Sequence, residues 1–117
     1  PTQFDPAVMH ASVDRILACQ PAALYLTHFS RVTDIPRLGD DLHRLIDAHL
    51  AVAERERATG PERGARILAG LWALMDAEAE RQGWPLNAAR RREVLGMDIE
   101  LNAQGLDYWL DQNPPPA

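Results

Sequence analysis

The sequence predicts a mainly α-helical chain with about five helices and one short strand at residues 22–27. Three observations support this prediction. Apolar residues recur every three or four positions over most of the 117 residues, which is the period of a helix with one buried face. Prolines and glycines divide these stretches where helices commonly start or stop. One apolar run, 22–30, lacks this period and is typical of a strand covered on both faces.

The first helix is predicted to begin at Asp5-Pro6, because an acidic N-cap followed by proline is a common helix start. Its apolar period continues to about Cys19, and Pro21 ends it. The buried strand 22–27 follows directly. A helix leading into a buried strand is half of a βαβ unit, and the other half is expected upstream.

Helices alone are predicted after Ser30. Thr33 or Asp34 caps a long helix that runs to about residue 58, and a Thr-Gly-Pro turn then restarts the chain. The third helix extends to about Gln82, with Gly83 as its stop. A short helix from Asn87 to residue 95 and a last helix over 99–110 are predicted on either side of Gly96. The proline-rich residues 113–117 are expected to form a disordered tail.

A solitary strand poses a problem, because burying unpaired backbone donors and acceptors is costly. We therefore expect residues 22–27 to pair with a second copy of the chain, or to adopt another structure when the chain is alone. The first outcome would make the protein a homo-oligomer through its exposed strand. Apolar helix faces left open offer a second route to self-association.

Composition indicates a folded, acidic protein. Hydrophobic residues make up 46% of the chain and the net charge is −5, so a nucleic-acid partner is not expected. The one basic cluster, Arg90–Arg92, is followed by Glu93 and is typical of a solvated helix face. No apolar run reaches the ~20 residues that a membrane span needs, so no membrane partner is expected.

Two absences point to a bacterial, cytoplasmic origin. All twelve basic residues are arginine, a bias typical of bacterial genes rich in G and C, and one that excludes lysine chemistry. Cys19 is the single cysteine, so no intrachain disulfide forms and a reducing compartment is the natural expectation. The chain opens on Pro1 without a signal pattern or an initiator methionine, which is expected of a fragment.

Four histidines are the candidates for metal chemistry. His43 and Asp47 stand one helical turn apart, with Asp40 one turn before them. Such spacing can hold a metal, but on a charged, exposed helix it more often does not. His49 falls on the apolar stripe of its helix and is expected to pack there, and His10 carries no signal. His28 differs, because a ligand at the end of a buried strand is well oriented for metal catalysis.

Two stretches around His28 resemble a known family. The helix pattern from Asp5-Pro6 through Ser12–Leu17, followed by Pro21–Phe29, resembles the end of the catalytic domain in metallo-β-lactamase-fold hydrolases. The later segment Met97–Leu106 is similar to the closing helix of one branch of that family, which carries a helical C-terminal extension. The resemblance covers nearly the whole chain, from residue 5 to residue 110.

The resemblance implies a specific role for His28. In this family a late helix leads into a final strand of an αββα catalytic domain, and the histidine that ends this strand is the last metal ligand. Residues 1–32 would then be the terminal helix-strand piece of that domain, and residues 33–112 the helical C-terminal domain. The intact protein would use zinc to generate a hydroxide nucleophile, with His28 on the second metal.

The departures from the family are equally specific. Its His-x-His-x-Asp-His motif, its intermediate histidine and its bridging aspartate are absent from residues 1–117 and would belong upstream of Pro1. Ser30 also stands where the family has glycine. Since one imidazole cannot hold zinc usefully, we expect the chain alone to be inactive and zinc to be bound tightly only in the intact parent.

Two functional hypotheses follow from different classes. The first is a C-terminal fragment of a zinc hydrolase, partnered by the missing N-terminal catalytic domain, whose helices shape substrate choice or assembly. The second is a stand-alone helical interaction or dimerisation module without a metal role. Its large apolar residues Trp72, Trp84 and Trp109 would fill an interface or, as is commoner, the core.

Overall fold

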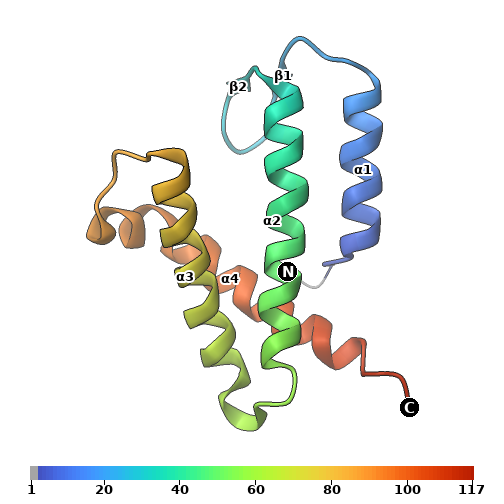
Figure 1. The fold of residues 1–117 in the computed structure, drawn as a ribbon, viewed down its shortest axis with the longest axis vertical. Helices are drawn as coiled ribbons and strands as arrows, with labels where there is room; N and C mark the ends of the chain where they lie inside the picture. Colours follow the sequence, from blue (N-terminus) through green and yellow to red (C-terminus); the bar gives the residue numbers. More distant parts are fainter. Residues whose placement is uncertain (1–2) are drawn as a thin grey trace. The chain divides into compact units, whose positions relative to one another are not determined.

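The structure is a computed structural model that describes residues 3–117 (Figure 1). These residues are mainly helical, as predicted, and contain four α-helices, one 3₁₀ turn and one two-stranded sheet. In chain order the elements are α1 (Pro6–Ala18), β1 (Leu24–Tyr25), β2 (Arg31–Val32), α2 (Ile35–Glu56), η1 (Gly60–Glu62), α3 (Arg63–Gln82) and α4 (Ala88–Gln112).

The described residues divide into two compact units, and the division falls within α2. One unit is Asp5–Ala48, which holds α1, the two strands and the first part of α2. The other contains residues 3–4 and 49–117, with the end of α2, α3 and α4. The boundary predicted at residues 32/33 concerns a catalytic domain and stays a prediction.

Helix α1 begins and ends as its sequence predicts. The Asp5 carboxylate accepts a hydrogen bond from the Val8 backbone N–H at 3.0 Å, and Pro6 occupies the first turn. This satisfies one of the backbone donors that a helix start leaves open. After Ala18, Gln20 adopts a left-handed backbone with φ of 49° before Pro21. No residue of α1 is buried, although the helix carries several large apolar side chains.

The buried, solitary strand predicted at residues 22–27 is wrong for this chain. β1 spans two residues and pairs antiparallel with β2, with Leu24 opposite Val32 and Tyr25 opposite Arg31. Tyr25 is 80% exposed, since a two-stranded ribbon covers neither of its own faces. Of the two outcomes expected for residues 22–27, the structure thus shows the second, another structure within the single chain, with Leu24 and Tyr25 paired to β2. Self-association of the chain stays a prediction.

Helices α2 and α3 match the predicted segments closely. Asp34 precedes α2 with φ of 58°, and its carboxylate accepts a hydrogen bond from Arg37 Nε at 2.6 Å. Gly83 ends α3 in the left-handed conformation at φ of 66°. Glycine adopts this backbone without the Cβ penalty that other residues meet, so the sequence signal for the helix end is confirmed.

The two helices predicted on either side of Gly96 are one continuous helix, α4, so the structure has four α-helices where five were predicted. Asn87 is the N-cap and accepts a hydrogen bond from the Arg90 backbone N–H at 2.9 Å. Glycine inside a helix costs only about 1 kcal/mol relative to alanine. That cost is too small to interrupt a helix whose apolar stripe continues through Ile99 and Leu106.

The core of the second unit lies along the seam of α3 and α4. Ile67 and Leu71 are fully buried on α3, and Gly70 brings α3 close to Val52 of α2. The α4 stripe faces them, with four buried residues: Ile99, Ala103, Leu106 and Leu110. The three tryptophans are half-buried rather than central. Trp109 meets Phe4 edge-on at 5.7 Å, and Arg92 lies 3.9 Å from the Trp72 ring centroid.

No helix within residues 3–117 is both long enough and apolar enough to cross a membrane.

Truncating Leu71 tests the importance of the α3–α4 seam. We expect Leu71→Ala to lower the free energy of unfolding by about 2–5 kcal/mol, because a cavity replaces a fully buried side chain. Leu101 on α4 is 42% exposed, so Leu101→Ala should change it by less than about 0.5 kcal/mol. Urea unfolding followed by circular dichroism measures both, and equal losses would contradict this core assignment.

A buried carboxylate makes the second unit sensitive to acid. Glu56 at the end of α2 is buried and accepts hydrogen bonds from Arg66 Nε at 2.9 Å and Arg55 Nε at 3.2 Å. The bond from Arg66, and then that from Arg55, lowers the pKa of Glu56. A carboxyl whose pKa is lower in the folded state stabilises the fold above its unfolded pKa, and this contribution is lost as pH falls.

We therefore expect Glu56→Gln to reduce stability at neutral pH and to flatten the loss of stability on acidification. Urea midpoints measured from neutral to acidic pH test this. Glu62, which is exposed and stands 3.9 Å from Arg66, provides the control: Glu62→Gln should leave the pH profile as it is. If Glu56→Gln has the same dependence of stability on pH as the unmodified chain, the Arg66–Glu56 ion pair does not cause the sensitivity to acid.

Candidate functional site

His28 lies on the turn that joins β1 to β2. The Leu26 N–H donates to the Ser30 carbonyl at 3.0 Å, and the Phe29 N–H donates to the Leu26 carbonyl at 3.4 Å, which closes the turn. The His28 side chain is exposed, and so are its neighbours Thr27 and Phe29. The expected position on the last rigid residue of a buried strand is therefore corrected to an exposed hairpin turn. Its role as a metal ligand stays a prediction.

The described residues do not fit a metal site around His28. Within residues 3–117, no group of three or more histidine, cysteine, aspartate or glutamate side chains is arranged to hold a metal ion. A catalytic zinc needs three protein ligands and an open position. His28 therefore has no such group of ligands around it within residues 3–117.

A second histidine cluster, which we call the His–Asp bridge, joins α1 to α2 within the first unit. The two Nδ1 atoms of His10 and His43 are 2.6 Å apart. Nε2 of His10 lies 2.7 Å from Asp47, and Nε2 of His43 lies 2.8 Å from Asp14. The two rings are nearly parallel, with an interplanar angle of 17° and centroids 4.9 Å apart. Four side chains thus form one continuous hydrogen-bonded chain.

The sequence predicts only part of this cluster. Its spacing groups His43 with Asp47 and Asp40 as a metal candidate and gives no role to His10. In the structure Asp47 bonds instead to His10, across the two helices. The missed signal is that His-x-x-x-Asp occurs once on each helix, at His10/Asp14 and at His43/Asp47. Residues four apart share a helix face, so antiparallel helices can exchange partners in this way.

A close apolar contact lies on the same pair of helices. A Cβ placed on Gly39 of α2 would stand 2.7 Å from Cδ2 of Leu17 on α1. A side chain at this position would therefore require the end of the Leu17 side chain to move. His49, further along α2, is half-buried as its place on the apolar stripe predicts.

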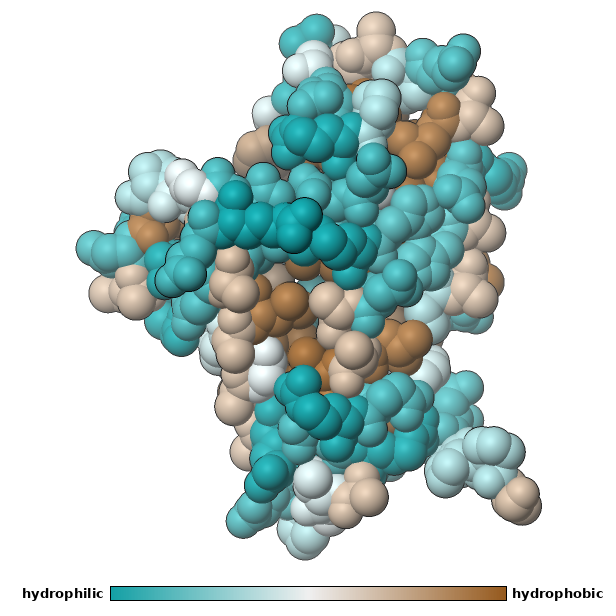
Figure 2. All heavy atoms as spheres, in the orientation of Figure 1, coloured by the Kyte–Doolittle hydropathy of each residue, from teal (hydrophilic) through white to brown (hydrophobic). Residues whose placement is uncertain are grey.

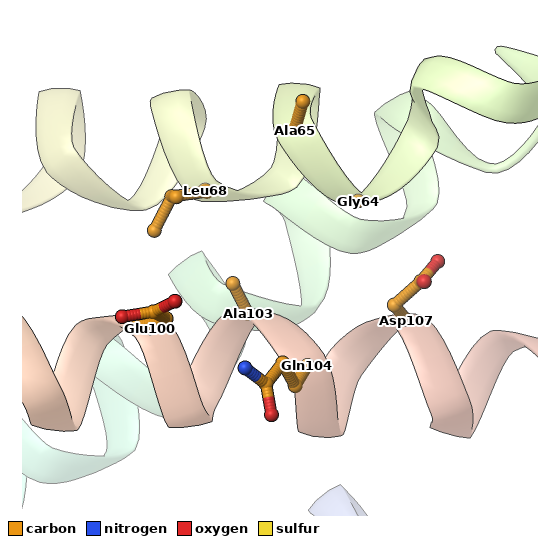
Figure 3. A pocket seen from close by; sticks show the side chains of 7 residues that line it. All are labelled: Gly64, Ala65, Leu68, Glu100, Ala103, Gln104 and Asp107. Carbon is orange, nitrogen blue, oxygen red and sulfur yellow. The ribbon is translucent and has the colours of Figure 1, made fainter.

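A small pocket lies between α3 and α4 in the second unit (Figure 3). Its volume is about 170 Å³. The space exists because small residues line it: Gly64, Ala65 and Ala103. Three polar residues of α4 also line it: Glu100, Gln104 and Asp107. Asp107 is already bound by Arg63. Substrate pockets commonly measure about 300–1,000 Å³, so this is a packing gap at the seam rather than a candidate active site.

Comparison of the chain with protein-family models, curated proteins and solved structures finds no match.

Adding a methyl group at Gly39 tests the contact between α1 and α2. We expect Gly39→Ala to stabilise the chain less than Gly96→Ala does, because the Leu17 side chain must move away from the α2 backbone and this offsets the gain of about 1 kcal/mol in helix propensity. Gly96→Ala is the matched control: a Cβ there meets nothing within 4 Å, so it should stabilise α4 by up to about 1 kcal/mol. Thermal unfolding of both variants measures the difference. Equal stabilisation by Gly39→Ala and Gly96→Ala would show that Leu17 does not pack there.

Proposed function

We propose that this chain is the C-terminal part of a bacterial, cytoplasmic zinc hydrolase of the metallo-β-lactamase superfamily. In this proposal the chain is inactive alone. It supplies His28 as one metal ligand, and its helices shape the substrate site or the assembly of the enzyme. The resemblance of residues 5–110 to that family motivates the proposal, and the apolar surface of the first unit supports it.

The observation that carries the proposal is an uncovered helix. α1 has no buried residue, yet Val8 is 58% exposed, Ile16 is 45% exposed and Met9 is 36% exposed. A helix normally folds with its apolar side chains against a core, and α1 lacks such cover within its own unit. A catalytic domain packed on α1 would provide it.

The hairpin presents apolar side chains beside His28. Tyr25 is 80% exposed, Phe29 is 77% exposed and Leu26 is 47% exposed. Brown, hydrophobic residues also reach the surface among the teal, polar ones in Figure 2. Clustered apolar exposure is typical of an interaction surface rather than of a free monomer. A neighbouring domain that covered these residues would also bring its own ligands to His28.

In the intact enzyme, zinc would supply a hydroxide nucleophile near neutral pH. The part of this chain is to position one imidazole. The β1–β2 pairing and the Ser30 carbonyl bond hold the turn on which His28 stands. Which bond the enzyme hydrolyses depends on residues outside this chain.

A stand-alone helical interaction module is the second candidate. Val94, Met97, Leu101 and Tyr108 are exposed on α4 and recur at intervals of three, four and seven, which places them on one helix face. This exposed apolar face lies on the side of α4 opposite to the buried apolar stripe of the same helix. Concentration-dependent self-association of the isolated chain that Met97→Glu abolishes would favour this candidate.

The intact gene product tests the proposal. We expect His28→Ala to lower zinc occupancy by about one ion per molecule and to reduce turnover of a hydrolase substrate by at least about 100-fold, in line with the loss of a metal ligand or its support. Ser30→Gly, which restores the residue typical of the family, is the control and should keep both. Full zinc content and activity in His28→Ala would remove His28 from the site.

Zinc binding by the isolated chain gives a second test. Because His28 is the one proposed ligand on the hairpin, the isolated chain should bind zinc weakly and without fixed stoichiometry. His28→Ala should abolish the zinc binding that is due to the hairpin. Equilibrium dialysis with metal analysis measures this. One tightly bound zinc per isolated chain would contradict the division of ligands between this chain and a missing domain.

A further inference from the structure

We infer that the His–Asp bridge is a proton-binding site: His10 and His43 share one proton between their Nδ1 atoms, and this proton fastens α1 to α2. The inference is independent of the proposed hydrolase function, because it concerns contacts within the first unit only.

The count of protons follows from the hydrogen bonds. Ionised aspartates only accept hydrogen bonds, so Nε2 of His10 and Nε2 of His43 must each carry a proton to bond Asp47 and Asp14. The Nδ1–Nδ1 contact needs one further proton, which one ring donates and the other accepts. The bridge is therefore complete with three protons on four ring nitrogens, that is, one imidazolium and one neutral imidazole.

Any other count breaks the bridge. With four protons, two N–H groups face each other across 2.6 Å and both rings are cationic, so the contact is repulsive. With two protons, one of the three hydrogen bonds has no donor. The attachment of α1 to α2 is thus strongest at intermediate pH and weakens on both sides.

The local charges favour the three-proton form. The charged groups that contact the rings are Asp14 from α1 and Asp47 from α2. Among residues 3–117, no arginine bonds to either carboxylate, so the positive charge on the rings is their nearest compensation. Both aspartates are 70% exposed at the side chain, while the rings are only 28% and 25% exposed. The shared proton therefore sits at the more sheltered, central position.

The geometry fits a proton better than a metal ion. Two nitrogen ligands of a tetrahedral zinc, each about 2.0–2.1 Å from the ion, stand about 3.3 Å apart. The Nδ1 atoms are closer than that, at 2.6 Å, as expected for a short, charge-assisted hydrogen bond. The centroid separation of 4.9 Å also matches the N–N distance plus two ring radii. The rings consequently meet edge to edge, with the proton between them.

The site has a consequence for the hairpin. α1 has no buried residue, and the His–Asp bridge and the Leu17–Gly39 contact are two close contacts that join it to α2 within its unit. Residues 19–23 connect α1 to β1, and the turn that carries His28 follows β1. Protonation of the bridge therefore controls how firmly this part of the chain is held.

Nitrogen-15 NMR of the full chain, labelled at histidine, tests the inference. We expect a scalar coupling between the two Nδ1 atoms through the shared proton at neutral pH. Exposed His28 should show no such coupling. Absence of N–N coupling between His10 and His43 over the whole pH range in which the chain is folded would overturn the inference. A spectrum that changes on adding a chelator would show a metal in place of the proton.

Variants extend the test to the helices. In His10→Gln, the N–N coupling should be lost, and so should the pH dependence of amide exchange in α1. His28→Gln is the matched control and should keep both. The exchange pattern of α3 and α4 reports whether each variant remains folded. Retention of pH-dependent protection of α1 in a folded His10→Gln chain would contradict the inference.

Discussion

The attachment of α1 to α2 is the constraint on which the first unit depends. α1 contributes no buried residue, so the usual source of helix stability, an apolar face packed on a core, is missing. What remains is polar and local: two histidines and two aspartates bonded in one chain, and Leu17 against Gly39. Both aspartates are 70% exposed, so each of their bonds to a histidine contributes at most about 1 kcal/mol, and the attachment depends on all of these contacts together.

The second unit has the opposite character. Fully buried Ile67 and Leu71 of α3 lie against the buried stripe of α4. Ion pairs between α3 and α4 add to this apolar contact. Asp76 on α3 accepts hydrogen bonds from Arg91 and Arg92 on α4, and the bond from Arg92 is the main cause of its lowered pKa. Such a unit is stable through its own core. In the hydrolase proposal it is therefore the first unit that needs cover from a partner, whereas the α3–α4 seam of the second unit is buried within the unit itself.

Much of the fold could be predicted from the sequence, because local chemistry sets helix ends. The Asp5 cap and the left-handed Gly83 are properties of a few neighbouring residues. β2 could not be predicted, because Arg31–Val32 is too short to show a period and exists only through its pairing with β1. The helix break predicted at Gly96 is wrong, because local propensity is outweighed by packing. The low helix propensity of glycine suggests a break, but the apolar stripe of α4 continues across it.

The candidate site shows the same limit. His28 was identified by its sequence context, yet its exposure on a turn depends on the hairpin that local patterns did not reveal. The role of His10 could not be predicted, because its partner His43 lies 33 positions away in the sequence. Spacing within one helix gives half of the His–Asp bridge. The other half requires knowing that α1 and α2 lie side by side and antiparallel, as Figure 1 shows.

The central claim is that α1 and the hairpin are built to be covered by another part of a larger enzyme. Hydrogen exchange of the intact gene product, compared with that of the isolated chain, tests it most directly. The account predicts that protection increases across residues 6–32 in the intact protein, while α3 and α4 exchange alike in both. Equal exchange of residues 6–32 in the two forms would contradict the claim.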